Sequence, residues 1–217
     1  MIYFTGVKNM KTTTLLAAMF ASTVAFSAQA TTTNLVVNGS FEDITPHSPL
    51  TNSWDILSSL PGWSVANNGV EIRNNVAGVA LDGNYYVELD TTRNSSIWQY
   101  LNTTAGQTYS LNFAYSPREG VGTGSNGIRL NVGNIVGGVA TGNGAANTGN
   151  VWENYSYTFT AVSSNTKLMF TAVGQSDSYG GSLDNVSVSA VPEANTYAMM
   201  LVGIGLIGFV ARRRRAL

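Results

Sequence analysis

The chain lacks cysteine altogether, has a single histidine among its 217 residues, and carries only one lysine beyond its first 30 residues. Without cysteine, disulfides, thiolate metal sites and cysteine nucleophiles are excluded. A serine-histidine-acid triad would have to use His47, and no serine lies in the strand-turn-helix setting of a nucleophile elbow. These absences argue against an enzyme.

Positive charge is scarce in the central part of the chain. Residues 31–191 hold five basic and eleven acidic residues, a formal charge of −6, although the whole chain carries only −1. Nucleic acids and anionic membrane surfaces are bound by clustered basic residues, and this acidic region has no such cluster. We therefore expect no nucleic-acid partner.

Residues 1–30 have the pattern of a secretory signal peptide. Two lysines precede a mainly apolar run, and Ala28 and Ala30 supply the small-x-small pattern of a cleavage site after Ala30. The apolar run is shorter than the roughly 20 residues that a membrane-spanning helix needs. Met10 is an alternative start of translation, because a lysine follows it directly. We expect this segment to be removed during export.

The C-terminal segment, residues 191–217, combines a Pro-Glu pair, an uncharged stretch at about 197–211 and a final cluster of arginines. The uncharged stretch is short for a bilayer unless flanking residues contribute, and the arginines would stay cytoplasmic under the positive-inside rule. A transmembrane helix that halts translocation is the simplest interpretation. The residues that carry this pattern are Val191, Pro192, Glu193, Arg212, Arg213, Arg214 and Arg215.

This arrangement resembles the PEP-CTERM sorting signal of Gram-negative bacteria that make extracellular polysaccharide. The resemblance implies that a membrane-embedded exosortase cuts near Pro192-Glu193 after transient anchoring in the inner membrane. It also implies a final location at the cell surface or in the extracellular matrix. Ala194 stands where the usual motif has a second proline, and the other parts of the motif are intact.

Between the two terminal segments, in residues 31–190, apolar residues recur with a period of two. Clusters rich in glycine, asparagine and serine separate these stretches. In QTYSLNFAY, residues 107–115, the tyrosine, leucine and phenylalanine side chains share one face. No segment has convincing helical periodicity. The pattern predicts an all-β domain, an antiparallel sandwich or barrel.

Two carboxylates stand near opposite ends of this domain. Asp184 shares a strand face with the apolar Val186, and Glu42 directly follows Phe41, which has the character of a core residue. A buried ionised carboxylate is costly unless it has a cation or hydrogen-bond donors. A calcium ion bound by both, with oxygens from the turn at Asn38, is one solution. Exposure at the strand ends, or hydrogen bonds from backbone N–H groups, is the alternative.

The segments NLVVNGSFE, PGW, NYYVELD, IWQYLNTTAGQTYSLNFAYSPR and SDSYGGSLDNVSV resemble the galactose-binding-like jelly rolls. Within that group they are most similar to the choice-of-anchor C domains and the related domain-of-unknown-function 642 family of plant cell-wall proteins. The resemblance covers nearly all of residues 34–190. It implies a jelly-roll β-sandwich and kinship with carbohydrate-binding modules. It also implies a structural calcium ion between the first and last strands, at the positions of Glu42 and Asp184.

Aromatic side chains are candidate sugar-binding groups, because their faces pack against sugar C–H groups while polar side chains bind the hydroxyls. Trp98 and Tyr100 alternate with Ile97 and Leu101, so both aromatics face outward if the aliphatic pair faces the core. Tyr86 completes a platform with them only if the strand register places it on the same surface. Three further candidates lie near predicted loops: Arg73, Arg118 and Tyr179.

We expect an exported, non-enzymatic surface or matrix protein that associates with extracellular polysaccharide or cell-wall glycan. Two alternatives remain. A flat apolar patch would indicate a structural or adhesive protein-protein module. Paired carboxylates across a cleft would indicate a weak glycan hydrolase, for which Glu71, Glu88 and Asp90 are available.

Overall fold

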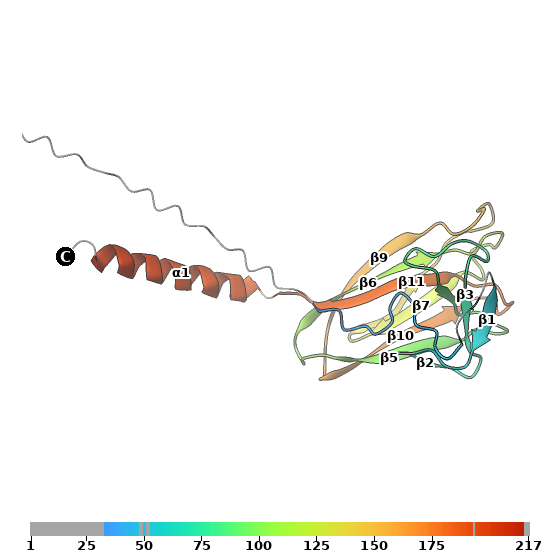
Figure 1. Cartoon of the computed structure of the whole chain (residues 1–217), viewed down its shortest axis with the longest axis horizontal. Helices are drawn as coiled ribbons and strands as arrows, with labels where there is room; N and C mark the ends of the chain where they lie inside the picture. Colours follow the sequence, from blue (N-terminus) through green and yellow to red (C-terminus); the bar gives the residue numbers. More distant parts are fainter. Residues whose placement is uncertain (1–32, 48–49, 51–52, 193, 215–217) are drawn as a thin grey trace, which may run out of the picture. The chain divides into compact units, whose positions relative to one another are not determined.

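The structure, a computed structural model, describes residues 33–47, 50, 53–192 and 194–214. The predicted signal peptide, with Ala28, Ala30 and Met10, lies outside these residues, as do Glu193 and Arg215 of the sorting signal. The described residues form eleven β-strands and one α-helix (Figure 1).

All strand pairs are antiparallel, and the strands form two sheets. The six-stranded sheet has the order β1-β3-β4-β11-β6-β9, and the five-stranded sheet has the order β2-β5-β10-β7-β8. The strand bounds are β1 Trp54–Leu57, β2 Ser64–Val65, β3 Val70–Arg73, β4 Tyr86–Glu88, β5 Ser96–Asn102, β6 Thr108–Ser116, β7 Gly127–Val132, β8 Ile135–Ala140, β9 Glu153–Thr160, β10 Asn165–Val173 and β11 Ser182–Ala190. This arrangement confirms the predicted antiparallel β-sandwich.

The core lies between the two sheets, where the apolar face of each strand meets the other sheet. Phe113 of β6 contacts Phe170 of β10 edge-on, with ring centroids 5.1 Å apart. Trp63, from the turn before β2, closes this core and lies 5.7 Å from the Phe41 ring and 6.3 Å from the Phe170 ring. The period of two in the sequence therefore produces the two inner faces.

The C-terminal helix α1 runs from Ala194 to Arg214 and contains the predicted helical stretch 197–211. Its last turn carries Arg212, Arg213 and Arg214, where positive charge interacts favourably with the helix dipole. Within the described part of the chain, no helix has both the length and the apolar character needed to cross a membrane. The helix is thus confirmed, whereas the predicted membrane span is not shown.

Candidate functional site

Charged residues gather on the face of β3 and β4 that points away from the core. The register pairs Glu71 with Glu88 and Arg73 with Tyr86, so these four side chains share one face of the six-stranded sheet. Ile72, between the two β3 residues, points the other way and belongs to the hydrophobic core. The strand pairing therefore builds a charged surface directly behind the core.

Arg73 and Arg118 bind the carboxylates of this surface. Arg73 Nη2 contacts Glu71 Oε1, and Arg73 Nε lies 3.2 Å from Glu88 Oε2. Arg118 Nη1 donates to the same Glu88 oxygen at 2.7 Å, and the Gly180 N–H donates to Glu88 Oε1 at 2.8 Å. Burial raises the pKa of Glu88 to about 7 and also raises the pKa of Glu71, against the opposing charge of the arginines. The network holds both guanidinium groups in fixed positions.

Asp90 fixes the loop that carries Tyr179. Its Oδ2 accepts the backbone N–H groups of Asp177 at 3.0 Å and Ser178 at 3.2 Å. Asp90 is fully buried, and this burial raises the pKa of its carboxyl group. Gly180, the residue after Tyr179, donates its backbone N–H to the buried carboxylate of Glu88. The loop is therefore held on both sides of Tyr179.

A cavity of about 270 Å³ opens beside this network, and we call it the Trp54 pocket. Trp54 of β1 is half exposed, and the Arg118 guanidinium carbon lies 4.9 Å from the centroid of the Tyr179 ring. The side chains that line the pocket are Trp54, Ile56, Glu71, Arg73, Val76, Thr91, Thr92, Arg118, Ser178 and Tyr179. The pocket thus combines aromatic rings with fixed charged groups and hydroxyls.

The pocket brings together three residues that the sequence predicted as ligand-binding: Arg73, Arg118 and Tyr179. Sequence reasoning missed Trp54, which enters the pocket because β1 pairs with β3 and places it opposite Arg73. Alternation with period two gives the face of a residue but not the strand that lies next to it. Only knowledge of that pairing would have found Trp54.

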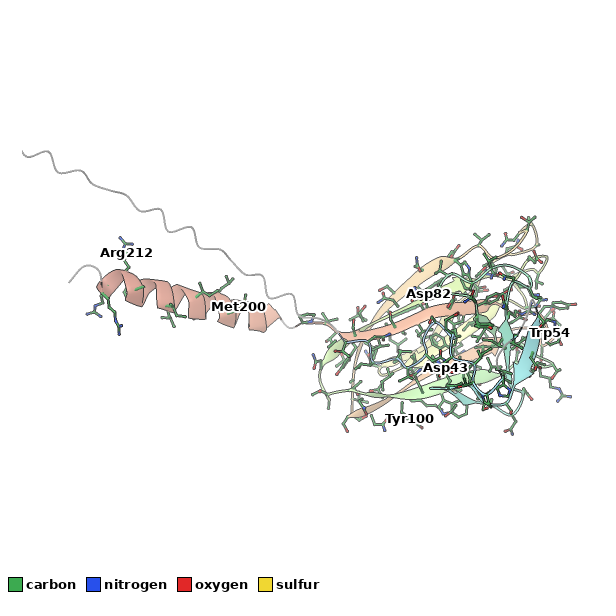
Figure 2. All side chains as sticks on the ribbon, in the orientation of Figure 1. Asp43, Trp54, Asp82, Tyr100, Met200 and Arg212 are labelled. Carbon is green, nitrogen blue, oxygen red and sulfur yellow. The ribbon has the colours of Figure 1, made fainter. Side chains whose placement is uncertain are left out.

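Strand β5 confirms the predicted alternation. Ile97 and Leu101 are buried in the core, and Trp98 and Tyr100 face away from it. Tyr100 is 60% exposed, and Lys167 Nζ lies 4.6 Å from the centroid of the Trp98 ring. The two aromatics share one surface of the five-stranded sheet. Tyr100 lies well apart from Trp54 of β1 (Figure 2).

Tyr86 does not share that surface, which corrects the three-residue platform expected from the sequence. It lies on β4, in the six-stranded sheet, and is fully buried. Its hydroxyl donates to the Val76 carbonyl, and its ring meets the Trp152 ring edge-on at 5.6 Å. Because β4 and β5 belong to different sheets, no change of register brings Tyr86 beside Tyr100.

A hollow of about 530 Å³ adjoins Tyr100, and its amide side chains already bind the protein itself. Gln99 Oε1 accepts the Val37 N–H at 3.0 Å, and Gln99 Nε2 donates to the Val37 carbonyl at 3.3 Å. Asn34 Oδ1 accepts the Val188 N–H at 3.0 Å. These amides hold the segment before β1 in place, so they offer less to a ligand than the side chains of the Trp54 pocket.

Glu42 and Asp184 both bind the loop of residues 81–85. Asp184 Oδ2 accepts the first two backbone N–H groups of the loop, at 2.8 and 3.0 Å. Glu42 Oε1 accepts the last two, at 2.8 and 2.7 Å. Asp184 is fully buried, and burial raises the pKa of its carboxyl group to about 6. Hydrogen bonds from backbone N–H groups, one of the alternatives that the sequence left open, are the arrangement observed.

These residues fit a calcium ion poorly. Asn38 has a φ of 53°, its Oδ1 accepts the Asp43 N–H, and its Nδ2 donates to the Asp43 and Pro61 carbonyls. Both Nδ2 protons and the Oδ1 oxygen of this side chain are therefore already hydrogen-bonded. Each of the two carboxylates also has one oxygen that faces two N–H donors, which a cation would have to displace. Over the described residues, no three acidic or histidine side chains converge as metal ligands. The calcium ion implied by the sequence resemblance is untested, and the hydrogen bonds of these residues argue against it.

Two packed antiparallel sheets with a pocket at the β1–β3–β4 end define a jelly-roll β-sandwich with a candidate ligand site. The family described as protein of unknown function DUF642 matches residues 34–189, most of the chain, and the chain therefore belongs to this family. The PEP-CTERM protein-sorting motif matches residues 190–215. Both matches confirm the resemblances seen in the sequence.

Solved structures that are similar to this chain include an α-L-arabinofuranosidase and two carbohydrate-binding modules. Arabinose-bound MgGH51 α-L-arabinofuranosidase is 10% identical, with a TM-score of 0.51 over 75% of this chain and 27% of that chain. TmCBM61 in complex with β-1,4-galactotriose is 18% identical, with a TM-score of 0.45 over 73% of this chain and 99% of that one. A family 35 carbohydrate binding module from Clostridium thermocellum is 20% identical, with a TM-score of 0.42 over 63% and 97%. At 10% identity, the likeness to the arabinofuranosidase shows the fold alone. No curated protein matches the chain.

Proposed function

We propose that this protein is an exported, surface-sorted glycan-binding protein whose Trp54 pocket holds a sugar residue. The observation that carries the proposal is the composition of that pocket. The half-exposed Trp54 ring, the Tyr179 ring and the guanidinium groups of Arg73 and Arg118 all line one cavity. Aromatic faces and fixed polar groups together are what sugar recognition requires.

The pocket is arranged for binding before any ligand arrives. Arg73 and Arg118 are held by Glu71 and Glu88, and the Tyr179 loop is held by buried carboxylates. Side chains that are already fixed lose little conformational entropy when a ligand binds. Because the guanidinium groups already contact Glu71 and Glu88, the pocket suits the hydroxyl groups of a sugar better than an isolated anion. The cavity of about 270 Å³ is just smaller than the roughly 300 Å³ at which pockets for drug-sized ligands begin, so its volume suits a single sugar residue.

The test is a glycan array followed by calorimetry with the full chain, its Trp54→Ala variant and a matched Tyr100→Ala variant. Both substitutions remove an exposed aromatic ring, one inside the pocket and one on the other sheet. We expect Trp54→Ala to weaken binding at least about tenfold and Tyr100→Ala to leave it unchanged. Loss of binding only in Tyr100→Ala would move the site to the surface of Trp98 and Tyr100. Absence of glycan binding by the wild type would refute the proposal and favour a structural or adhesive module.

We propose further that the protein is not a glycoside hydrolase. Such enzymes place two accessible carboxyl groups on either side of the scissile bond. Glu71 lines the pocket, but Glu88, its cross-strand partner, is fully buried and bonded to Arg118 and Gly180. Hydrolysis of any glycan that binds, lost in Glu71→Gln, would contradict this part of the proposal.

The sorting motif supports export, processing by an exosortase near Pro192-Glu193, and a final place at the cell surface or in extracellular polysaccharide. Transient contact of residues 197–211 with the inner membrane belongs to the same proposal. In a host that has an exosortase, replacement of Pro192 and Glu193 by alanine should leave the unprocessed form, whose mass is measurable by mass spectrometry. A Ser189→Ala variant, altered outside the motif, should be processed normally. Normal processing of both would contradict the proposal.

A further inference from the structure

A second hollow, of about 640 Å³, lies next to the Trp54 pocket, and we call it the Glu119 pocket. The residues that line it are Glu119, Gly120, Val121, Gly122, Gly124, Ser125, Gln175, Asp177 and Tyr179. It is formed by the glycine-rich loop before β7 and the loop between β10 and β11. Neither segment takes part in the strand pairing that builds the core.

Tyr179 separates the two pockets, because it lines both of them. On each side of this boundary, sequence neighbours face different pockets. Arg118 lines the Trp54 pocket while Glu119 lines the second one, and Ser178 lines the Trp54 pocket while Asp177 lines the second. The Tyr179 ring is 48% exposed and carries the Arg118 guanidinium group 4.9 Å from its centroid. The two pockets are therefore adjacent, with an exposed aromatic ring between them.

The boundary is firmly held. Asp177 Oδ2 accepts the Ser125 hydroxyl at 2.7 Å, which joins the two loops of the second pocket. The backbone N–H of Asp177 is bonded to the buried Asp90, and the backbone N–H of Gly180 to the buried Glu88. The ring of Tyr179 is thus presented on a loop with fixed ends, as a stacking surface for a ligand that passes over it.

The charge of the second pocket differs from that of the first. Its lining residues, all within the described part of the chain, include two carboxylates, Glu119 and Asp177, and no basic side chain. Gln175 adds a neutral amide. An anionic group in this position would face two like charges with no cation among the lining residues. A hydroxyl, acetamido or amino group would meet no such repulsion.

We propose that the two pockets form consecutive subsites for a glycan chain of at least two residues that crosses Tyr179, and that the Glu119 pocket accepts neutral or amino sugars but rejects uronic acids. This inference rests on the proposed function, since it takes the Trp54 pocket as the first subsite. It adds a minimum ligand length and a charge preference, neither of which follows from the Trp54 pocket alone.

The experiment is a binding measurement with the full chain on gluco-, galacto-, manno- and xylo-oligosaccharides of one to six residues. The C2-amino and C6-carboxylate forms of the hexose oligosaccharides are included, so that charge varies on a constant backbone. We expect neutral disaccharides and longer chains to bind about tenfold more tightly than the monosaccharide. We also expect these neutral chains to bind at least about tenfold more tightly than uronic-acid chains of the same length. Added salt should narrow the second difference, because it screens the exposed carboxylates.

Three variants assign the effect. Tyr179→Ala should reduce the affinity for a disaccharide to that for the monosaccharide, and Tyr179→Phe should restore it, because the ring rather than the hydroxyl is required. The double change Glu119→Gln and Asp177→Asn should raise the affinity for uronic-acid chains about tenfold relative to the affinity for neutral chains. Glu153→Gln, which removes an exposed acid outside both pockets, is the matched control and should change nothing.

The outcomes separate the two proposals. Equal affinity for mono- and disaccharides, or uronic chains bound as tightly as neutral ones, overturns the subsite inference while Trp54-dependent binding upholds the proposed function. No binding of any probe by the wild type overturns both. Tyr179→Ala that binds disaccharides like the wild type also overturns the inference, provided that its thermal midpoint shows that it is folded.

Discussion

The buried Glu88 leads to a specific prediction about the pH dependence of stability. Burial raises its pKa from 4.5 to about 7 in the folded protein. Between these two values the folded state holds a proton that the unfolded state has released, so the free energy of unfolding rises as the pH falls. At 1.36 kcal/mol per pH unit, the gap amounts to about 3 kcal/mol. This stabilisation is complete below pH 4.5 and is lost as the pH rises through 7.

The perturbation that isolates this effect is Glu88→Gln. Glutamine keeps an oxygen for the Gly180 N–H and carries no titratable proton. Urea unfolding between pH 5 and pH 8 should show the wild type gaining about 3 kcal/mol or more toward pH 5, since burial also raises the pKa values of Asp184 and Asp90. Over the same pH range, the free energy of unfolding of the variant should rise by about 3 kcal/mol less than that of the wild type.

Two results would refute the reasoning. A Glu88→Gln profile parallel to that of the wild type would show that Glu88 does not titrate in this range. A wild type that loses stability on acidification would show that the ion pairs with Arg73 and Arg118 outweigh burial, because a stabilised carboxylate has a lowered pKa. Glu153→Gln, an exposed acid on β9, should keep the wild-type slope.

Three further predictions concern the metal, the core and the pocket wall. A bound calcium ion, present at 100 times its dissociation constant, would raise the free energy of unfolding by about 2.7 kcal/mol. Because N–H donors already occupy Asp184, we expect the same thermal midpoint with calcium and with chelator. A shift of the midpoint that Asp184→Asn abolishes would show that calcium binds. Phe170→Ala empties the centre of the core and should cost about 3–5 kcal/mol in urea unfolding. In Gly144→Ala the new Cβ would collide with the Arg118 carbonyl, so we expect the free energy of unfolding to fall by about 1–3 kcal/mol and glycan binding to weaken. A variant that binds glycan like the wild type would show that this loop does not position the site.

The sequence predicts those features that depend on alternation along one strand. Ile97 and Leu101 are apolar and their neighbours are aromatic, so the faces of β5 follow from a period of two wherever the strand pairs. The sorting motif likewise depends on contiguous residues, and its helix is found where the composition indicates it. Local order in the chain is enough for both.

The Trp54 pocket depends on pairings between distant segments, which alternation does not specify. Trp54 meets Arg73 through the pairing of β1 with β3, and Tyr179 reaches the same cavity through a loop held by Asp90. The hydrogen-bond partners of Glu42 could not be predicted for the same reason, because the backbone N–H groups that donate to it lie some forty residues away in the sequence. Tyr86 was misplaced because sheet membership is a property of the whole fold.

Strand β11 connects the pocket end of the sandwich to the sorting signal. At its start, Ser182 pairs with Glu88 beside the Trp54 pocket, and at its end Ala190 pairs with Tyr109. The Val191 N–H still bonds to the Thr108 carbonyl, so the folded sandwich continues up to the residue before Pro192 without a flexible spacer. Nine strand residues at about 3.3 Å each span about 30 Å. A protein tethered at its sorting motif would therefore display its pocket at the far end of a rigid body, about 30 Å from the point of attachment.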